Sequence, residues 1–405
     1  MNKHSAHRSL WRNREYLLLW LGEQGVSALG TGISQLAFPL LILTLTDSPA
    51  AAGFSAALQQ VPPLLLSLPA GALIDRWNRR RVMLVCALGL LLCVGSIPAA
   101  LVIGRLTLAQ VYVVAFGIGS FATFSRLAEF GAIAYLVPKE QMPTAVAQDE
   151  AAYSTVSLLA PSLSGWLFSI KRLLPFLADA CSYLVLLGAL LLMRRPLQGP
   201  RSAEPPHLLR DVREGIGWLW SHELLRMLAF LAGYLETLLT SSVLVVLVIA
   251  QQHNISTALV GVVLAVGGIG NLAGTVLGTQ LQRRARFGRA LLIVMPGFVL
   301  VWPLYGFATT PLWLGAVVVA WAIVDSTSVV QIVSYRLTSV PDELQGRVTS
   351  VYRLIVFGEV ALGQALIGLC LQQFGVLATV GILWAGLLVF AISLLVSRQA
   401  RRADG

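Results

Sequence analysis

Long apolar runs alternate with short polar gaps along the whole chain. Each run holds roughly 20 or more residues, which as an α-helix rising about 1.5 Å per residue crosses the ~30 Å hydrocarbon core of a bilayer. The pattern therefore predicts an all-α polytopic membrane protein with twelve transmembrane helices in two six-helix bundles. The spans are predicted near residues 15–45, 51–74, 82–103, 107–136, 144–169, 174–193, 224–250, 256–281, 290–307, 311–336, 347–372 and 375–397.

A polar stretch rich in proline and glycine at residues 194–206 separates the sixth span from the seventh. Apolar residues then recur at helical spacing as far as Trp220, opposite charged residues, which is typical of an amphipathic helix on a membrane surface. The alternative is that this segment only begins the seventh span. We predict an N-terminal six-helix bundle at 1–193, a cytoplasmic linker with an amphipathic helix at 194–222 and a C-terminal six-helix bundle at 223–405.

Lysine and arginine gather at the two ends of the chain and in alternate gaps between the apolar runs. In a polytopic membrane protein this distribution marks the cytoplasmic side, so it predicts that both termini are cytoplasmic. The clusters contain Lys3, Arg8, Arg12 and Arg14, then Arg76, Arg79, Arg80 and Arg81, then Arg194, Arg195, Arg201, Arg210 and Arg213, then Arg283, Arg284, Arg286 and Arg289, and finally Arg398, Arg401 and Arg402.

Composition supports a membrane protein, because 57% of the residues are hydrophobic and only 12% are charged. A soluble chain would carry about 25% charged residues. The net charge is +10, and the positively charged residues flank the apolar runs and do not line one polar face. We therefore expect membrane lipids as partners, through the anionic headgroups of the cytoplasmic leaflet, and no nucleic acid.

The two halves of the chain look like copies of each other. The sequence L-V-P-K-E at 136–140 precedes span five, and S-V-P-D-E at 339–343 precedes span eleven. Residues 71–76, before span three, have a weaker counterpart at 278–283, before span nine. Two pseudo-symmetric halves predict a site at their interface, near the bilayer midplane, that opens alternately to each side.

Three motifs resemble the major facilitator superfamily, and within it the drug-efflux branch that includes macrolide and siderophore exporters. Residues 71–81 are similar to the G-x-L-x-D-R-x-G-R-R loop between spans two and three, with Asn78 in place of a glycine. Residues 136–142 resemble the L-V-P-x-E-Q-L segment before span five. Residues 341–350 resemble the P-x-E-L-x-G-R-V-x-S segment before span eleven. The resemblance implies the twelve-helix fold of that superfamily.

The first motif carries the predicted gating residues, Gly71, Asp75, Arg76 and Arg79, and the third contributes Arg347. A carboxylate beside a helix N-terminus is favoured by ~0.3–1 kcal/mol at exposed sites. The resemblance implies that Asp75, the N-terminus of span eleven and Arg347 hold the cytoplasmic side shut. The alternative for the arginines is that they only set the topology.

Two further motifs are predicted to pack helices together. Pro161 and Gly165 lie in A-P-S-L-S-G, which resembles the antiporter motif G-P-x-x-G-G with two glycines replaced. Gly270 and Gly274 belong to a G-x-x-x-G repeat in span eight, and small residues at this spacing let helix backbones approach closely. By analogy with the superfamily, we expect the two motifs to face each other across the halves.

Ionisable residues inside the spans are costly and are therefore candidates for function. The resemblance implies that spans one, four, seven and ten line the central cavity. The predicted cavity residues on these spans are Glu23, Arg126, Glu129, Glu236 and Asp325. Arg126 and Glu129 form either a functional cluster or a structural ion pair, while we expect Glu359 to serve packing and Asp179 to pair with Lys171 and Arg172 at the outer surface.

The sequence favours a secondary transporter of the inner membrane that exports an amphiphilic small molecule. The predicted cavity residues comprise four acids and one arginine, and this excess of acids favours a cationic or zwitterionic cargo. A neutral macrolide-like or siderophore-like cargo stays open. No histidine lies within a span, so proton antiport would use carboxylates. We expect a monomer with no cofactor, driven by the proton gradient. The alternatives within the same class are import and lipid flipping. An alternative from another class is a membrane-embedded enzyme or sensor, and the enzyme is disfavoured because the sequence shows no cluster of nucleophile and base near a span end.

Overall fold

The computed structural model describes residues 10–193, 197 and 208–397, and these contain helices and no β-strand. The chain folds into two compact units. Unit 1 comprises residues 1–38 and 61–206, and unit 2 comprises 39–60 and 207–405. The boundary at 206/207 falls inside the predicted linker, whereas residues 39–60 group with the second unit and not with the N-terminal half that the sequence suggested.

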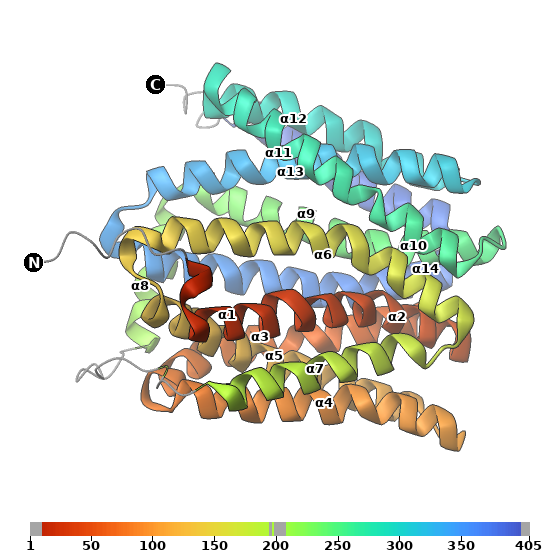
Figure 1. The fold of residues 1–405 in the computed structure, drawn as a ribbon. Helices are drawn as coiled ribbons and strands as arrows, with labels where there is room; N and C mark the ends of the chain where they lie inside the picture. The colour runs from red at the N-terminus through yellow and green to blue at the C-terminus, as the bar shows by residue number, and fades with distance from the viewer. Residues whose placement is uncertain (1–9, 194–196, 198–207, 398–405) are drawn as a thin grey trace, which may run out of the picture. The chain divides into compact units, whose positions relative to one another are not determined.

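Unit 1 is built from the first long helices of the chain (Figure 1). Polar side chains fix where these helices begin: Asn78 accepts a hydrogen bond from the N–H of Arg81, and Thr107 accepts one from Gln110. Gly104 ends α4 with a left-handed φ of 71°. The helices that lie wholly or partly in unit 1 are α1 (Arg14–Trp20), α2 (Ala28–Thr46), α3 (Pro49–Arg76), α4 (Arg79–Ile103), α5 (Leu108–Leu136), α6 (Met142–Ile170) and α7 (Leu174–Leu192).

The second segment of unit 2 begins with the amphipathic helix α8 (Leu208–Ser221), which confirms the helix predicted in the linker. Leu219 of α8 is buried with Val348 and Val351, so one side of α8 packs against the beginning of α14. The remaining helices are α9 (Glu223–Gln252), α10 (Thr257–Ala265), α11 (Gly267–Arg284), α12 (Phe287–Val301), α13 (Pro311–Ser339) and α14 (Gln345–Val396). Residues 194–196 and 198–207 of the predicted linker lie outside the described residues.

Each of the twelve predicted spans coincides with helical structure. Spans eleven and twelve form the single element α14, which turns at Gly375, where φ is 75°. Span eight corresponds to α10 followed directly by α11. Nine helical segments in the described part of the chain are long and apolar enough to cross a membrane. This number is lower than twelve because α14, which covers two spans, counts once, and because α3 and α6 are more polar and are not among the nine. The fold class is therefore confirmed.

The span-eight glycines pack within one unit. A Cβ added at Gly270 would lie 2.8 Å from Ala322 Cβ, and one at Gly274 would lie 2.9 Å from Ser326 Cβ, so both glycines press against α13. The expectation that this repeat faces span five across the halves stays a prediction. Close approach of two helix backbones needs small residues, and α13 is the helix that meets them.

The proline motif of span five meets a different helix. Pro161 lies inside α6 and Gly165 is buried. The preceding residue, Ala160, has its Cβ 2.7 Å from where a Cβ at Gly32 would lie. The motif thus brings α6 close to α2 inside unit 1, which gives it a packing role.

Candidate functional site

The first span is not a continuous α-helix. Residues Leu21–Ser27 form a π-helix between α1 and α2, and the N–H of Ala28 bonds to the carbonyl oxygen of Glu23, five residues earlier. A π-helical turn holds more residues than an α-turn, and such turns are rare and frequent at functional sites. The sequence analysis missed this turn, although Gly22 and Gly25 on either side of Glu23 and Gln24 were a signal.

The π-helix lets two consecutive side chains reach the same neighbouring helix. Ser125 Oγ of α5 donates to Glu23 Oε1 over 3.1 Å, and Gln24 Nε2 donates to Glu129 Oε1 over 2.7 Å. Ser125 and Glu129 are four residues apart, so they lie on one face of α5. We call these four residues the Glu23–Glu129 site.

The Glu23–Glu129 site is short of hydrogen-bond donors. Glu23 Oε2 is buried and has no hydrogen-bond partner among the described residues. Glu129 is 7% exposed, and its one hydrogen bond with a described residue comes from Gln24. A buried carboxylate that lacks donors is costly when ionised and is relieved by a proton or by a cationic group. The site can therefore take up positive charge.

Arg126 does not pair with Glu129. Its side chain is exposed, and no ion pair within 4.0 Å joins the two residues in the described part of the chain. Although the i, i+3 spacing permits contact, Glu129 turns toward the π-helix and bonds Gln24 instead. The structural ion pair, one of the two alternatives that the sequence left open, is therefore not formed among the described residues, while a role of Arg126 in transport stays a prediction. Sequence reasoning also missed Gln24 and Ser125, whose polar side chains are common in spans.

Unit 2 holds three more intramembrane carboxylates. Asp325 of α13 is 8% exposed and lies within electrostatic range of Glu236 of α9, whose side chain is exposed. Glu359 of α14 packs against Gly233, because a Cβ there would lie 2.8 Å from the Glu359 Cδ. Glu359 thus packs against α9, as expected, one turn before Glu236. The acids of three helices, α9, α13 and α14, therefore lie toward one region of unit 2.

Asp179 is not an outer-surface residue. It is 1% exposed and accepts a hydrogen bond from Ser182 Oγ over 3.4 Å. A Cβ at Gly30 would lie 2.9 Å from its Oδ1, so Asp179 presses against α2. The expected pairing with Lys171 and Arg172 is therefore wrong. The sequence could not show which face of α7 turns inward, and Asp179 is a further buried carboxylate of unit 1.

The arginines of the first motif bind carbonyl groups of neighbouring helices. Arg79 Nη1 donates to the carbonyl oxygen of Gly131 over 2.9 Å. Arg80 donates to the carbonyls of Leu190 and Leu191, at the end of α7, over 2.9 and 3.0 Å. A cation at a helix C-terminus satisfies carbonyl groups that have no partner in the helix and interacts favourably with its dipole. Arg80 therefore caps the end of α7, and Arg79 joins α4 to α5, which gives both arginines a structural role.

The other members of the predicted gating group are placed only in part. Arg76 is exposed, and a Cβ at Gly71 would meet no atom within 4 Å. The side chain of Asp75 lies outside the described part of the structure, so its pairing stays a prediction.

Arg347 bonds the amphipathic helix. Its Nη1 donates to Glu214 Oε2 of α8, and Arg210 Nε donates to Glu214 Oε1 over 2.9 Å. The hydrogen bond from Arg210, together with the charge of Arg347, lowers the pKa of Glu214. Gly215 makes room for this contact, because a Cβ there would lie 3.0 Å from the Arg347 backbone carbon. Arg347 thus ties α8 to the first turn of α14.

Comparison with known proteins agrees with these features. Residues 24–363 match the sequence model of the Major Facilitator Superfamily. The enterobactin exporter EntS of Salmonella typhi is 25% identical over 379 residues, which cover 91% of this chain and 89% of that protein. The protein of the same name from Escherichia coli O139:H28 is also 25% identical, over 91% of this chain and 88% of that protein.

Solved structures share the fold. A bacterial homologue of the human lysosomal transporter Spinster matches with a TM-score of 0.74 and 14% identity, over 97% of this chain and 98% of that one. A bacterial homologue of the iron transporter ferroportin matches with a TM-score of 0.75 and 17% identity, over 96% and 99% of the two chains. At these identities the likeness shows the fold alone.

Proposed function

The chain belongs to the major facilitator superfamily of secondary transporters, and on that premise we propose that it exports an amphiphilic small molecule in exchange for protons. It is a multi-pass protein of the bacterial inner membrane and a transporter, not an enzyme. The proposed cargo is cationic or zwitterionic. We further propose that both termini are cytoplasmic, that the protein works as a monomer and that the proton gradient is its energy source, without a cofactor.

The Glu23–Glu129 site carries this proposal. Two carboxylates of unit 1 sit side by side on a π-helix and on α5, and one carboxylate oxygen has no hydrogen-bond partner among the described residues. A proton on Glu23 Oε2 would relieve that oxygen and would leave the hydrogen bonds from Ser125 and Gln24 in place. Proton binding therefore needs no rearrangement of the side chains, which suits a group that must be loaded and unloaded in each cycle.

The acids of unit 2 support a positively charged cargo. Glu236 and Asp325 lie within electrostatic range of each other, and Glu359 reaches the same helix, α9. Neighbouring carboxylates repel each other unless a proton or a cation lies between them. A cargo that bears an ammonium or guanidinium group would lower this repulsion, whereas an anionic cargo would increase it.

A second candidate is a siderophore-like cargo. The observation that favours it is the similarity to the enterobactin exporter EntS, which extends over 91% of this chain. Such a cargo would be recognised by apolar and hydrogen-bonding contacts and not by the acids, so removing the acids would impair coupling but would leave binding intact.

The test is transport by purified protein in proteoliposomes with an imposed pH gradient. We expect ethidium, as the cationic probe, to accumulate against its gradient in exchange for protons, and we expect Glu23→Gln and Glu129→Gln each to abolish this proton-driven accumulation. Glu223→Gln removes an exposed carboxylate at the start of α9 and is the matched control. A catecholate siderophore tested in parallel identifies the second candidate.

Three results would contradict the proposal. Accumulation that ignores the pH gradient would exclude proton coupling. Wild-type accumulation by both glutamine variants would exclude the Glu23–Glu129 site as the proton site. Uptake in the direction of proton flow would identify an importer.

A further inference from the structure

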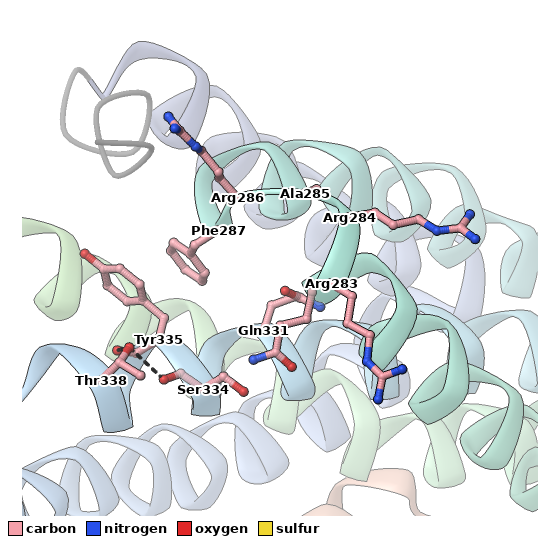
Figure 2. A pocket seen from close by; sticks show the side chains of 10 residues that line it. Arg283, Arg284, Ala285, Arg286, Phe287, Gln331, Ser334, Tyr335 and Thr338 are labelled. Atoms are coloured by element: carbon pink, nitrogen blue, oxygen red, sulfur yellow. Dashed lines mark hydrogen bonds between the residues drawn. The ribbon is translucent and has the colours of Figure 1, made fainter.

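A pocket of about 410 Å³ lies where the turn between α11 and α12 meets α13 (Figure 2). It is lined by residues of unit 2 alone and contains none of the acids of the proposed transport site. Its volume falls within the roughly 300–1,000 Å³ that is usual for small-molecule sites. The sequence analysis treated this turn only as one of the clusters of positive charge that set the topology.

A polar stripe of α13 forms one wall of the pocket. Gln331, Ser334, Tyr335 and Thr338 line it at spacings of three and four residues, so they share one face of the helix. Gln331 Nε2 donates to the carbonyl oxygen of Gly278 over 2.8 Å. This hydrogen bond continues the close glycine contact of α11 with α13 and fixes the end of α11 beside the stripe.

An aromatic pair holds the opposite side of the turn. The rings of Phe287, the first residue of α12, and Tyr335 are stacked with centroids 3.9 Å apart and planes 13° apart. Stacked rings in this geometry are worth about 0.5–1.5 kcal/mol beyond the area that they bury. The wall is therefore built before any ligand arrives, and ligand binding does not have to order it.

The turn supplies positive charge to the pocket. Arg283, Arg284 and Arg286 line the pocket, and its lining contains no aspartate or glutamate. The side chains of Arg283 and Arg284 are exposed and make no hydrogen bond or ion pair with a described residue. In Figure 2 the side chains of Arg284 and Arg286 extend from the turn to either side. Each guanidinium offers five N–H donors in a planar fork.

We propose that this pocket binds a phosphate ester. The guanidinium fork matches the oxygens of a phosphate, and the hydroxyl groups of Ser334 and Tyr335 on the stripe offer further hydrogen bonds. The arginines of this turn belong to the side that the distribution of charge assigns to the cytoplasm, where anionic lipids gather. The phosphate belongs either to the headgroup of an anionic phospholipid or to a soluble phosphate compound.

The test compares a pocket variant with a charge-matched control. The variant Arg283→Gln/Arg284→Gln removes the two arginines, and the control Arg81→Gln/Arg213→Gln removes two exposed arginines elsewhere on the same expected side. Delipidated protein in neutral detergent is titrated with phosphatidylglycerol or phosphatidylcholine under native mass spectrometry, and separately with glycerol 3-phosphate or glycerol while thermal unfolding is followed.

We expect phosphatidylglycerol, glycerol 3-phosphate or both to bind the wild-type protein and the control variant. Their affinity for the pocket variant should be lower by a factor of roughly ten or more. Binding of phosphatidylglycerol alone identifies a lipid headgroup as the ligand, and protection by glycerol 3-phosphate alone identifies a soluble phosphate compound. Equal binding by the pocket variant and the wild type, equal weakening in both variants, or no phosphate-dependent effect at all would overturn the proposal. Transport activity is not the readout, so failure here is distinct from failure of the export proposal.

Discussion

Two glycines control how closely α3 approaches α14 within unit 2. A Cβ at Gly53 of α3 would lie 2.8 Å from the Cα of Gly368, and a Cβ at Gly368 would lie 2.7 Å from the carbonyl oxygen of Pro49. Next to them Gln372 Oε1 accepts hydrogen bonds from Ser48 Oγ over 2.6 Å and from the N–H of Ala50 over 3.2 Å. We predict that Gly53→Ala, and independently Gly368→Ala, weakens this contact and favours a conformer in which it is open.

The size of the effect follows from what the added methyl group meets. Alanine is favoured over glycine inside a helix by up to about 1 kcal/mol, but this gain is the same in every conformer that keeps the helix. The clash exists only where the helices touch, and its partners are backbone atoms, which cannot rotate away. Overpacking costs about 1–3 kcal/mol, which changes the ratio of closed to open conformers by about 5–150-fold.

Gly381→Ala is the control for this prediction, because it lies in α14 and a Cβ there would meet no atom within 4 Å. The assay is labelling of a cysteine introduced at Ser48, in a background without the four native cysteines, by a membrane-impermeant maleimide. We expect Gly53→Ala and Gly368→Ala to raise the labelling rate at least fivefold, and Gly381→Ala to leave it unchanged. If both contact variants label at the rate of the control, the glycine contact does not determine the conformational equilibrium.

Two further predictions concern the ends of the helices. The pKa of Glu214 is lowered, so its contacts with Arg210 and Arg347 stabilise the protein at pH values above 4.5, the ordinary pKa of a glutamate, and this contribution is lost as the pH falls through the folded-state pKa. Glu214→Gln should remove this acid-dependent component from melting curves recorded between about pH 3 and pH 6. An unchanged pH profile would contradict this prediction. Arg80→Ala should destabilise the protein by about 1 kcal/mol, because the carbonyls of Leu190 and Leu191 lose their charged donor. The side chain of Arg81 has no hydrogen-bond partner among the described residues, so Arg81→Ala should not lower the melting temperature in the same assay. Equal effects of the two substitutions would exclude the capping role of Arg80.

The twelve spans could be predicted because a bilayer allows few solutions. Backbone groups in hydrocarbon must bond within their own helix, so an apolar run of sufficient length becomes a helix whatever its neighbours are. The helix at 208–221 was predictable for a related reason, since its apolar residues recur at helical spacing. These features depend on local sequence alone.

The side-chain contacts could not be predicted, because they depend on how each helix is rotated. Asp179 and Arg126 both lie in apolar spans, yet the first is 1% exposed and the second is exposed. The repeat at Gly270 and Gly274 indicated close packing correctly but not that α13 is the partner. Likewise, an apolar run has the same hydropathy whether it forms an α-helix or a π-helix, so hydropathy does not identify the turn that presents Glu23 and Gln24 to α5.

The boundary between the two units falls at prolines of the first two spans. The chain leaves unit 1 after Phe38 and re-enters it at Val61, and Pro39 and Pro62 lie inside α2 and α3 at these points. A proline inside a helix removes one backbone hydrogen bond and clashes with the carbonyl four residues earlier. Both helices are therefore weakest where they pass from one unit to the other. The contact of Gly53 with α14 lies within unit 2, whereas the π-helix that holds Glu23 lies within unit 1, so opening of the contact and loading of the proposed proton site can be separate steps of one cycle.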